Sequence, residues 1–134
     1  MHKLYDHKEL ATRIKSLIRN DRLFRDIHFS RETLTKELGI SPARISQIFK
    51  EELGTTFYDY VNRQRVYHAR HLLRSPTHKN DTLEDIAIQS GFCNRMTMHR
   101  MYLKVYGISP GEERKNESKN LKVKSMVSIF PENL

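Results

Sequence analysis

Three observations predict an all-α fold. It consists of two helix-turn-helix units joined by a long linker helix, with about seven helices in all. The chain of 134 residues carries nearly the same pattern twice, about 52 positions apart. Each copy has a short apolar stretch, a glycine, and a longer amphipathic stretch closed by a second glycine, at Gly39 and Gly54 and then at Gly91 and Gly107. Apolar residues at helical spacing also fill the segment between the copies and the segment before them.

Residues 1–29 are predicted to hold an opening helix followed by a link. The helix is expected over about residues 8–20, where apolar residues recur at spacings of four, three and one on a single stripe: Leu10, Ile14, Leu17 and Ile18. The apolar residues Phe24, Ile27 and Phe29 then follow with less regular spacing, which is typical of a link.

The first helix-turn-helix unit is predicted over residues 30–55. Ser30 is a candidate N-cap of its short helix, and Gly39 suits the left-handed turn that ends it. Ser41 and Pro42 then start the second helix, because proline at the first helical position loses no needed hydrogen bond. That helix is expected to run to about residue 53 and to turn its apolar residues inward: Ile45, Ile48, Phe49 and Leu53.

The linker helix is predicted within residues 56–75. Thr56 and Asp59 resemble a capping box, and helical spacing of apolar residues continues from Phe57 to about Arg74. A helix of that length spans about 27 Å at 1.5 Å per residue. We therefore expect it to fix the separation of the two units, with a polar loop over residues 75–81 after it.

The second unit, with a last short helix, is predicted over residues 82–116. Thr82 is its candidate N-cap, and its longer helix is expected to turn Met98, Met101, Tyr102 and Tyr106 inward. Ser109 and Pro110 then open the last helix. Residues 117–134 form a tail whose apolar side chains lie among lysines and serines, so a frayed tail, a short strand and a strap over the second unit all remain open: Leu121, Val123, Met126, Val127, Ile129 and Phe130.

The charge balance favours polyanionic partners. There are 24 Lys and Arg against 16 Asp and Glu, a net charge of +8 and a pI near 9.7. Such a balance suits nucleic acid first and an anionic membrane second, and it is also compatible with a merely basic protein. The repeated helix-turn-helix pattern decides for double-stranded DNA. The sequence has no run of about 18 apolar residues and no apolar leader, and it has one cysteine, so a cytoplasmic location without a membrane partner is expected.

The residues that would read DNA are those that remain on each second helix once its inward-facing apolar residues are set aside. In a helix-turn-helix the second helix enters the major groove, and its apolar face packs on the first helix. Arg can bind guanine and Gln can bind adenine through two hydrogen bonds, while Ala and Met can contact the thymine methyl group. The base-reading candidates are therefore Ala43, Arg44, Ser46 and Gln47 in the first unit and Arg95, Met96, Thr97, His99 and Arg100 in the second.

Phosphate contacts are expected from basic side chains beside these helices and from helix N-termini, whose free N–H groups attract anions. The basic candidates are Lys50, Arg63 and Lys104, and the capped N-termini are those at Ser41, Thr56 and Ser109. For each of these residues a solvated surface position is the alternative interpretation.

Other signals are weaker. Cys93 lies where the second reading helix begins, where a thiol pKa falls, so a redox switch is conceivable, but a small residue tolerated beside a cap is the better interpretation. His68 and His71 could share a metal, although no Cys, Asp or Glu completes the site, and surface histidines are favoured. No nucleophile motif or glycine-rich phosphate loop supports catalysis or a cofactor.

A protein-interaction module of the same fold, without specific DNA reading, is the alternative function. It would dock on RNA polymerase or titrate another regulator. A pure interaction surface is depleted of charge at its centre and rich in aromatics. The outward faces instead carry Arg44, Gln47, Arg95, His99 and Arg100, which favours DNA.

The ordered set of motifs resembles the DNA-binding domain of the AraC/XylS family of bacterial transcription regulators over about residues 8–115. The resemblance is carried by the first unit, 34–54, by the linker, 57–73, and by matches in the second unit: Ile86-Ala87, Gly91-Phe92, Arg100, Tyr102, Lys104, Tyr106 to Pro110 and Arg114. It implies seven helices whose two reading helices enter successive major grooves about 34 Å apart on one DNA face. It also implies an asymmetric target near a promoter and activation of transcription through RNA polymerase.

Three departures accompany the resemblance. The family often has a proline early in the second reading helix, where this chain has Arg95, and an aromatic residue where this chain has Glu113. The second change makes the apolar segment 123–130 a candidate to compensate in the packing of the last helix. The family's usual N-terminal sensor or dimerisation domain also has no counterpart, so the chain is expected to be either a stand-alone member or the C-terminal part of a larger regulator.

Overall fold

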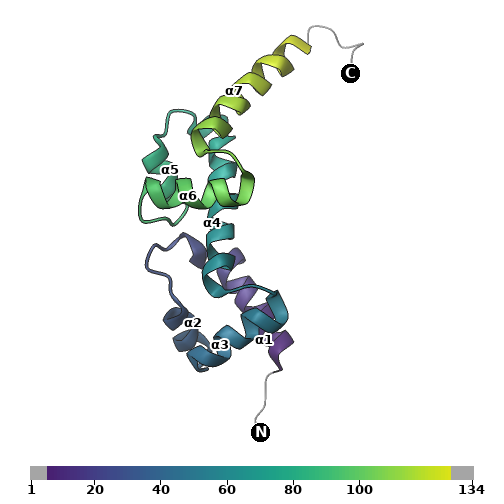
Figure 1. The fold of residues 1–134 in the computed structure, drawn as a ribbon, viewed down its shortest axis with the longest axis vertical. Helices are drawn as coiled ribbons and strands as arrows, with labels where there is room; N and C mark the ends of the chain where they lie inside the picture. The colour runs from purple at the N-terminus through teal and green to yellow at the C-terminus, as the bar shows by residue number, and fades with distance from the viewer. Residues whose placement is uncertain (1–5, 128–134) are drawn as a thin grey trace.

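A computed structural model describes residues 6–127 of the chain, and the side chains of residues 6–120. Over this range the protein is all helical, with seven α-helices and no strand, and this confirms the predicted fold class. Figure 1 shows an elongated molecule in which two helical halves lie one after the other along a central helix, α4. The predicted apolar segment 123–130 and the first five residues carry no described side chains.

The first half surrounds one apolar core. Its helices are α1 (His7–Lys15), α2 (Arg31–Leu38) and α3 (Pro42–Ile48), and π-helical turns extend α1 over Ser16–Asn20 (η1) and α3 over Phe49–Leu53 (η3). The predicted stripes meet in this core: Leu10, Ile14 and Ile18 from the opening helix, Leu34 from α2, and Ile45, Ile48 and Phe49 from α3 are all buried. Leu53, also predicted to turn inward, is partly buried against them.

The linker helix α4 (Phe57–Leu73) belongs to both halves. Val61 lies in the first core, and Val66, Ala69, Leu72 and Leu73 lie in the second. Thr56 caps the helix, because its hydroxyl accepts the Asp59 N–H at 3.0 Å. One continuous helix therefore carries the two cores, as the sequence predicted.

The second half repeats the plan around α5 (Leu83–Gln89) and α6 (Arg95–Tyr106), after a single 3-10 turn, η4 (Pro76–His78), in the predicted polar loop. Thr82 and Asp85 form a reciprocal capping box at the start of α5. Ile86, Phe92, Met98 and Tyr102 are fully buried between α4, α5 and α6. The predicted inward residues Met101 and Tyr106 are partly buried on the same side of α6.

The last helix is longer than expected. The sequence predicted a short helix ending near residue 116, whereas α7 spans Pro110–Val127 and extends away from the rest of the molecule in Figure 1. The prediction placed its end where the apolar pattern changes. A helix can continue past such a point because its backbone hydrogen bonds do not require a buried stripe.

A buried carboxylate anchors α7 to the second half. Glu113 is 4% exposed, and its Oε1 accepts a 2.7 Å hydrogen bond from the Tyr102 hydroxyl. Its carboxylate also pairs with the Nε atoms of Arg70 at 3.2 Å and Arg74 at 3.6 Å on α4. Burial, and then this hydrogen bond, raise the pKa of Tyr102 far above its usual range, so the phenol remains a donor. Glu113 thus replaces aromatic packing at this position by an ionic contact among α4, α6 and α7.

The predicted irregular link contains a 3-10 turn, η2 (Leu23–Arg25), that joins the two halves directly. Arg25 donates through Nε to the Gln89 carbonyl at 3.1 Å, at the end of α5. Arg65 on α4 donates through Nε to the Phe24 carbonyl at 2.7 Å, and burial lowers its pKa. Gly91, at φ +97°, lies so close that a Cβ atom there would be 2.2 Å from the Phe24 oxygen. We call this set of contacts the η2 brace.

Candidate nucleic-acid interface

The outward face of α3 is the one predicted from its apolar stripe. Ala43, Ser46, Gln47 and Lys50 are exposed, and Arg44 is half-buried. The buried side of the same helix is formed by Ile45, Ile48 and Phe49. The helix therefore presents polar and cationic groups to solvent, as a major-groove reader must.

Two of the predicted readers on α3 are held by neighbouring side chains. The Ser46 hydroxyl accepts a hydrogen bond from Arg31 Nη1 at 2.8 Å, and Gln47 donates from Nε2 to Glu51 Oε2 at 2.9 Å. Glu51 Oε1 in turn contacts His7 Nδ1 at 3.1 Å. The hydrogen bonds from Gln47 and then His7 lower the pKa of Glu51, so this residue is an acceptor at neutral pH. Among the described residues, the Gln47 carboxamide oxygen and its second N–H have no hydrogen-bond partner, so both can face a base edge.

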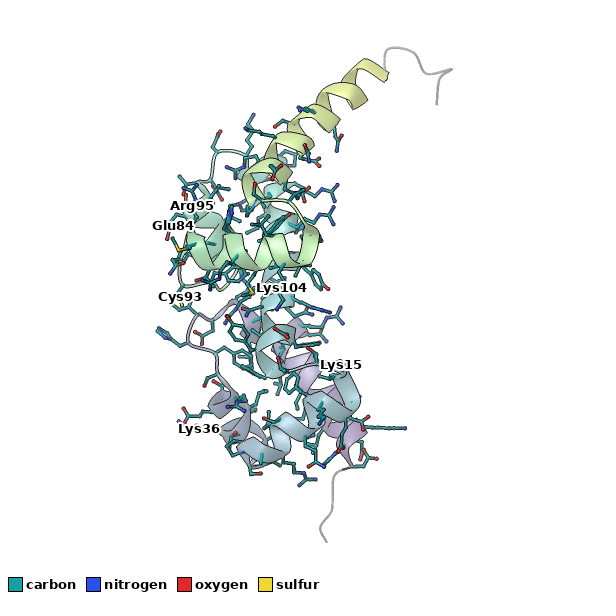
Figure 2. All side chains as sticks on the ribbon, viewed as in Figure 1. Lys15, Lys36, Glu84, Cys93, Arg95 and Lys104 are labelled. Atoms are coloured by element: carbon teal, nitrogen blue, oxygen red, sulfur yellow. The ribbon has the colours of Figure 1, made fainter. Side chains whose placement is uncertain are left out.

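The outward face of α6 carries the second predicted set. Arg95, Met96, His99 and Arg100 are exposed, and Thr97 is half-buried. Figure 2 shows Arg95 at the start of this helix and Lys104 near its end, with Cys93 just outside the first turn. The N-cap is Asn94, whose Oδ1 accepts both the backbone N–H of Thr97 at 2.9 Å and its hydroxyl at 3.0 Å.

The three predicted N-terminal phosphate sites differ in electrostatics. Ser41 caps α3 by accepting the Arg44 N–H at 3.2 Å, and no acidic residue lies in the first turn of α3. At α4, capped by Thr56, Asp59 lies in the first turn. At α7 two acidic residues share the first turn, and Glu112 accepts the Ser109 N–H at 3.0 Å. A phosphate is therefore favoured most at Ser41 and least at Ser109.

The three predicted basic contacts also differ in what they touch. Lys50 lines a hollow of about 860 Å³ beside α3, together with Arg31, Ser46 and Thr56. Arg63 and Lys104 line a smaller hollow of about 360 Å³ between α4 and α6. Lys104 Nζ lies 3.7 Å from Asp59 Oδ1, an exposed ion pair that is weak enough to be exchanged for a phosphate.

Sequence reasoning missed three residues that shape these faces, Arg31, Glu51 and Asn94, and it predicted Asp59 only as part of the cap of α4 and not as the partner of Lys104. Arg31 begins α2, the helix that crosses the DNA backbone in such units, and this position was the signal that could have found it. Asn94 is a preferred N-cap type, and this preference could have identified it as the cap of α6, for which no N-cap was predicted. Contacts of Glu51 and Asp59 with other helices had no sequence signal.

The remaining chemical features are few. Cys93 is an exposed free thiol. The rings of His68 and His71 lie 6.4 Å apart, and no group of three or more metal-binding side chains forms among the residues described. No helix in the described part of the chain is long and apolar enough to span a membrane.

Comparisons with known proteins agree with the presence of two helix-turn-helix units. A helix-turn-helix domain model matches residues 34–116. An HTH-type transcriptional regulator of Mycobacterium tuberculosis is 37% identical over 82 residues, which are 61% of this chain and 30% of that protein. The lactose operon transcription activator of Staphylococcus xylosus is 30% identical over 95 residues, 71% of this chain and 33% of that protein.

The fold has a solved counterpart as well. The DNA-binding domain of the transcription factor AdpA, solved in complex with a target DNA, superposes with a TM-score of 0.72 at 18% identity, covering 82% of this chain and 94% of that one. The chain spans about a third of the length of the two curated relatives above. The family match covers both helix-turn-helix units, and the chain belongs to the AraC-type helix-turn-helix family of DNA-binding transcription regulators.

Proposed function

We propose that this protein binds a specific, asymmetric double-stranded DNA site by placing α3 and α6 in successive major grooves, and that it activates transcription. The observation that carries the proposal is the pair of outward faces on α3 and α6, which both carry polar and cationic side chains and belong to two units joined by one continuous helix, α4. In Figure 1 the two helices lie at different heights along the molecule, each crossing its long axis.

Affinity in this proposal comes from cations and specificity from the reading helices. Lys50, Arg63 and Lys104, together with Arg31, neutralise phosphates and release counterions, so binding weakens steeply as salt rises. Gln47 and Arg100 are the strongest candidates for two-point contacts with a base. Arg31 has a further role, because its hydrogen bond to Ser46 links a backbone contact to a reader.

Activation and its partners rest on relatives. A match to a lactose operon transcription activator supports a positive role, with RNA polymerase as the partner at a promoter. A sensor or dimerisation domain, in the same chain or a separate one, would supply control, and the cytoplasm is where such a regulator meets bacterial DNA. A module that only binds protein is the competing function, and the cationic reading faces argue against it.

Selection of bound sequences from a random duplex library at near-physiological salt tests the proposal. Enrichment of two short motifs about one helical turn apart is expected. On the selected site, Gln47→Ala and Arg100→Ala should each cost about 1–3 kcal/mol and relax preference at one base pair. Equal losses on selected and random DNA would contradict the base-reading roles, and recovery of no motif by a folded protein would favour the interaction module.

A further inference from the structure

A basic hollow of about 460 Å³ lies between the two halves, on none of the surfaces discussed so far. Its walls come from η1 and the η2 turn in the first half, from α4, and from η4 and the end of α5 in the second half. Nine residues line it, and six of them are Arg or His: Arg19, Arg22, Arg25, His68, His71 and His78, with Phe24, Leu72 and Gln89. We call it the inter-half hollow.

The positive charge of the inter-half hollow is largely uncompensated. No carboxylate is among its lining residues, and the acid at its border, Asp81, contacts His78 Nδ1 at 2.8 Å and Gln89 Nε2 at 3.0 Å. Arg25 is engaged by a backbone carbonyl, and no carboxylate among the described residues forms an ion pair with it. Arg22 makes no ion pair with any described residue, and it holds the left-handed conformation at φ +62° that turns the chain into η2.

The surroundings of His68 disfavour its protonated form. Its pKa falls from 6.5 to about 4, first through burial and then through repulsion from Arg25, His71, Arg22 and His78. Its ring packs edge-on against Phe24 with centroids 5.5 Å apart, and the His71 ring lies 6.4 Å away. The hollow therefore combines cationic groups with flat, partly apolar surfaces.

The inter-half hollow is separate from the DNA-reading surface. No lining residue belongs to α3 or α6. On α4, Asp59 pairs with Lys104 of α6, so Asp59 marks the side of α4 that faces α6. His68 follows nine residues later, which is two and a half turns of an α-helix, and it therefore lies on the opposite side of α4. Arg63, beside α6, and Leu72, in the hollow, are related in the same way. The hollow thus opens on the side of α4 opposite to α6.

We propose that the inter-half hollow binds a phosphate-bearing small molecule of about the size of a mononucleotide or sugar phosphate. Its volume lies within the range of about 300–1,000 Å³ that is usual for small-molecule sites. Guanidinium groups match phosphate oxygens through paired hydrogen bonds, and Arg22 with Arg25 supplies two such groups at one edge. The exposed ring of His71 and the half-buried ring of His68 offer surfaces on which a base or sugar packs.

Ligand binding there has a consequence that rests on the proposed DNA function. The first half contributes the three arginines and the second half contributes His78 and Gln89, so a bound ligand bridges the halves beside the η2 brace. Restricting their relative motion changes the fit of α3 and α6 to a two-groove site. By linkage, DNA of the preferred spacing changes ligand affinity by the same factor.

Titration calorimetry with AMP and with inorganic phosphate, at ionic strength held constant with NaCl, tests the site itself. Saturable binding of AMP is expected, weakened at least about tenfold in the double variant Arg22→Ala, His71→Ala, whose side chains are both exposed and so leave the fold intact. Lys36→Ala, which removes a positive charge on α2 far from the hollow, should bind AMP like the unchanged protein. Circular dichroism confirms folding of each variant.

Comparing AMP with inorganic phosphate separates the contribution of the phosphate group to affinity from that of the nucleoside. AMP binding much tighter than phosphate assigns contacts to the nucleoside, and equal binding assigns the site to the phosphate group alone. In NMR, saturating AMP should raise the pKa of His68 in the unchanged protein and leave it unaltered in the double variant. No saturable binding, or the same loss in Lys36→Ala as in the double variant, overturns the proposal.

A second arm measures affinity for the selected duplex with and without saturating AMP. A change in the unchanged protein that disappears in the double variant supports coupling. Simple competition between AMP and duplex that persists in the double variant places AMP on the DNA surface and overturns the site. If the library selection yields no specific duplex, calorimetry still shows whether AMP binds in the inter-half hollow. Failure of the proposed DNA function can therefore be distinguished from failure of the proposed ligand site.

Discussion

Removing the carboxylate of Glu113 should destabilise the second half more than the removal of an acidic side chain from a helix surface usually does. In Glu113→Ala the buried Tyr102 hydroxyl loses its acceptor, 2.7 Å away, and an unsatisfied buried donor costs about 1–3 kcal/mol. The ion pair with Arg74 adds little, because this side chain is 43% exposed and regains water. Arg70 is 37% exposed as a side chain, but its Nε is buried, so the loss of Glu113 also leaves this atom without its ionic partner. We expect a total loss of about 2–4 kcal/mol in the free energy of unfolding.

The conservative variant separates hydrogen bonding from charge. Glu113→Gln keeps an oxygen for Tyr102 and loses only the ion pairs, so it should cost about 1 kcal/mol. Thermal and urea denaturation followed by circular dichroism measure both changes, with about 3–5 °C of melting temperature expected per kcal/mol.

Glu112→Ala is the matched control, since it removes the same charge one residue earlier from an exposed capping interaction. It should cost about 0.5–1 kcal/mol. Glu113→Ala no more destabilising than Glu112→Ala would refute the assignment of a buried anchor, as would equal losses in the alanine and glutamine variants of Glu113.

Three further outcomes are expected. Gly91→Ala, which forces a Cβ against a backbone oxygen at positive φ, should destabilise by about 2–4 kcal/mol in urea denaturation. Gly111→Ala is its control: a Cβ there would make only ordinary van der Waals contacts, 3.9 Å from Ser109 Oγ and 4.0 Å from Leu83 Cδ1, so stability should change by less than about 1 kcal/mol. Because the folded pKa of His68 is depressed to about 4, stability should be full above about pH 6.5 and fall as pH drops toward 4, and His68→Phe should flatten that part of the curve. Glu51→Ala frees Gln47 and should lower the preference for the selected duplex over random DNA several-fold, while affinity for random DNA stays the same or rises because a negative charge is lost beside α3; an unchanged preference would contradict a positioning role.

Local chemistry explains why most helices could be predicted from the sequence. Caps such as Ser41 and Thr82, closing glycines and apolar spacing act within a few residues. As a result α2, α5, α6 and α3 together with η3 begin and end close to the predicted positions. The same subtraction of buried residues correctly gave the exposed faces of α3 and α6, although their DNA contacts remain predictions.

Long-range polar contacts explain what could not be predicted. Glu113 lies among charged residues and has the pattern of a solvated helix face; its burial depends on Tyr102, 11 residues away, and on Arg70 in another helix. Arg65 likewise donates to carbonyl groups about 40 residues earlier, and a carbonyl has no signature in side-chain patterning. The η2 brace therefore appeared in the sequence only as an irregular link.

The continuity of α4 restricts how the binding specificity of such a protein can evolve. Each residue inserted into this helix would advance the second half by 1.5 Å and rotate it by about 100°, while one added base pair rotates a half-site by about 35° over about 3.4 Å. The rise and rotation per inserted residue therefore do not match the rise and rotation per added base pair. The contacts of the η2 brace further oppose any change in the relative position of the two halves. Changes in recognised sequence are therefore accessible through single substitutions on α3 or α6, whereas the distance between half-sites is effectively inherited with the fold.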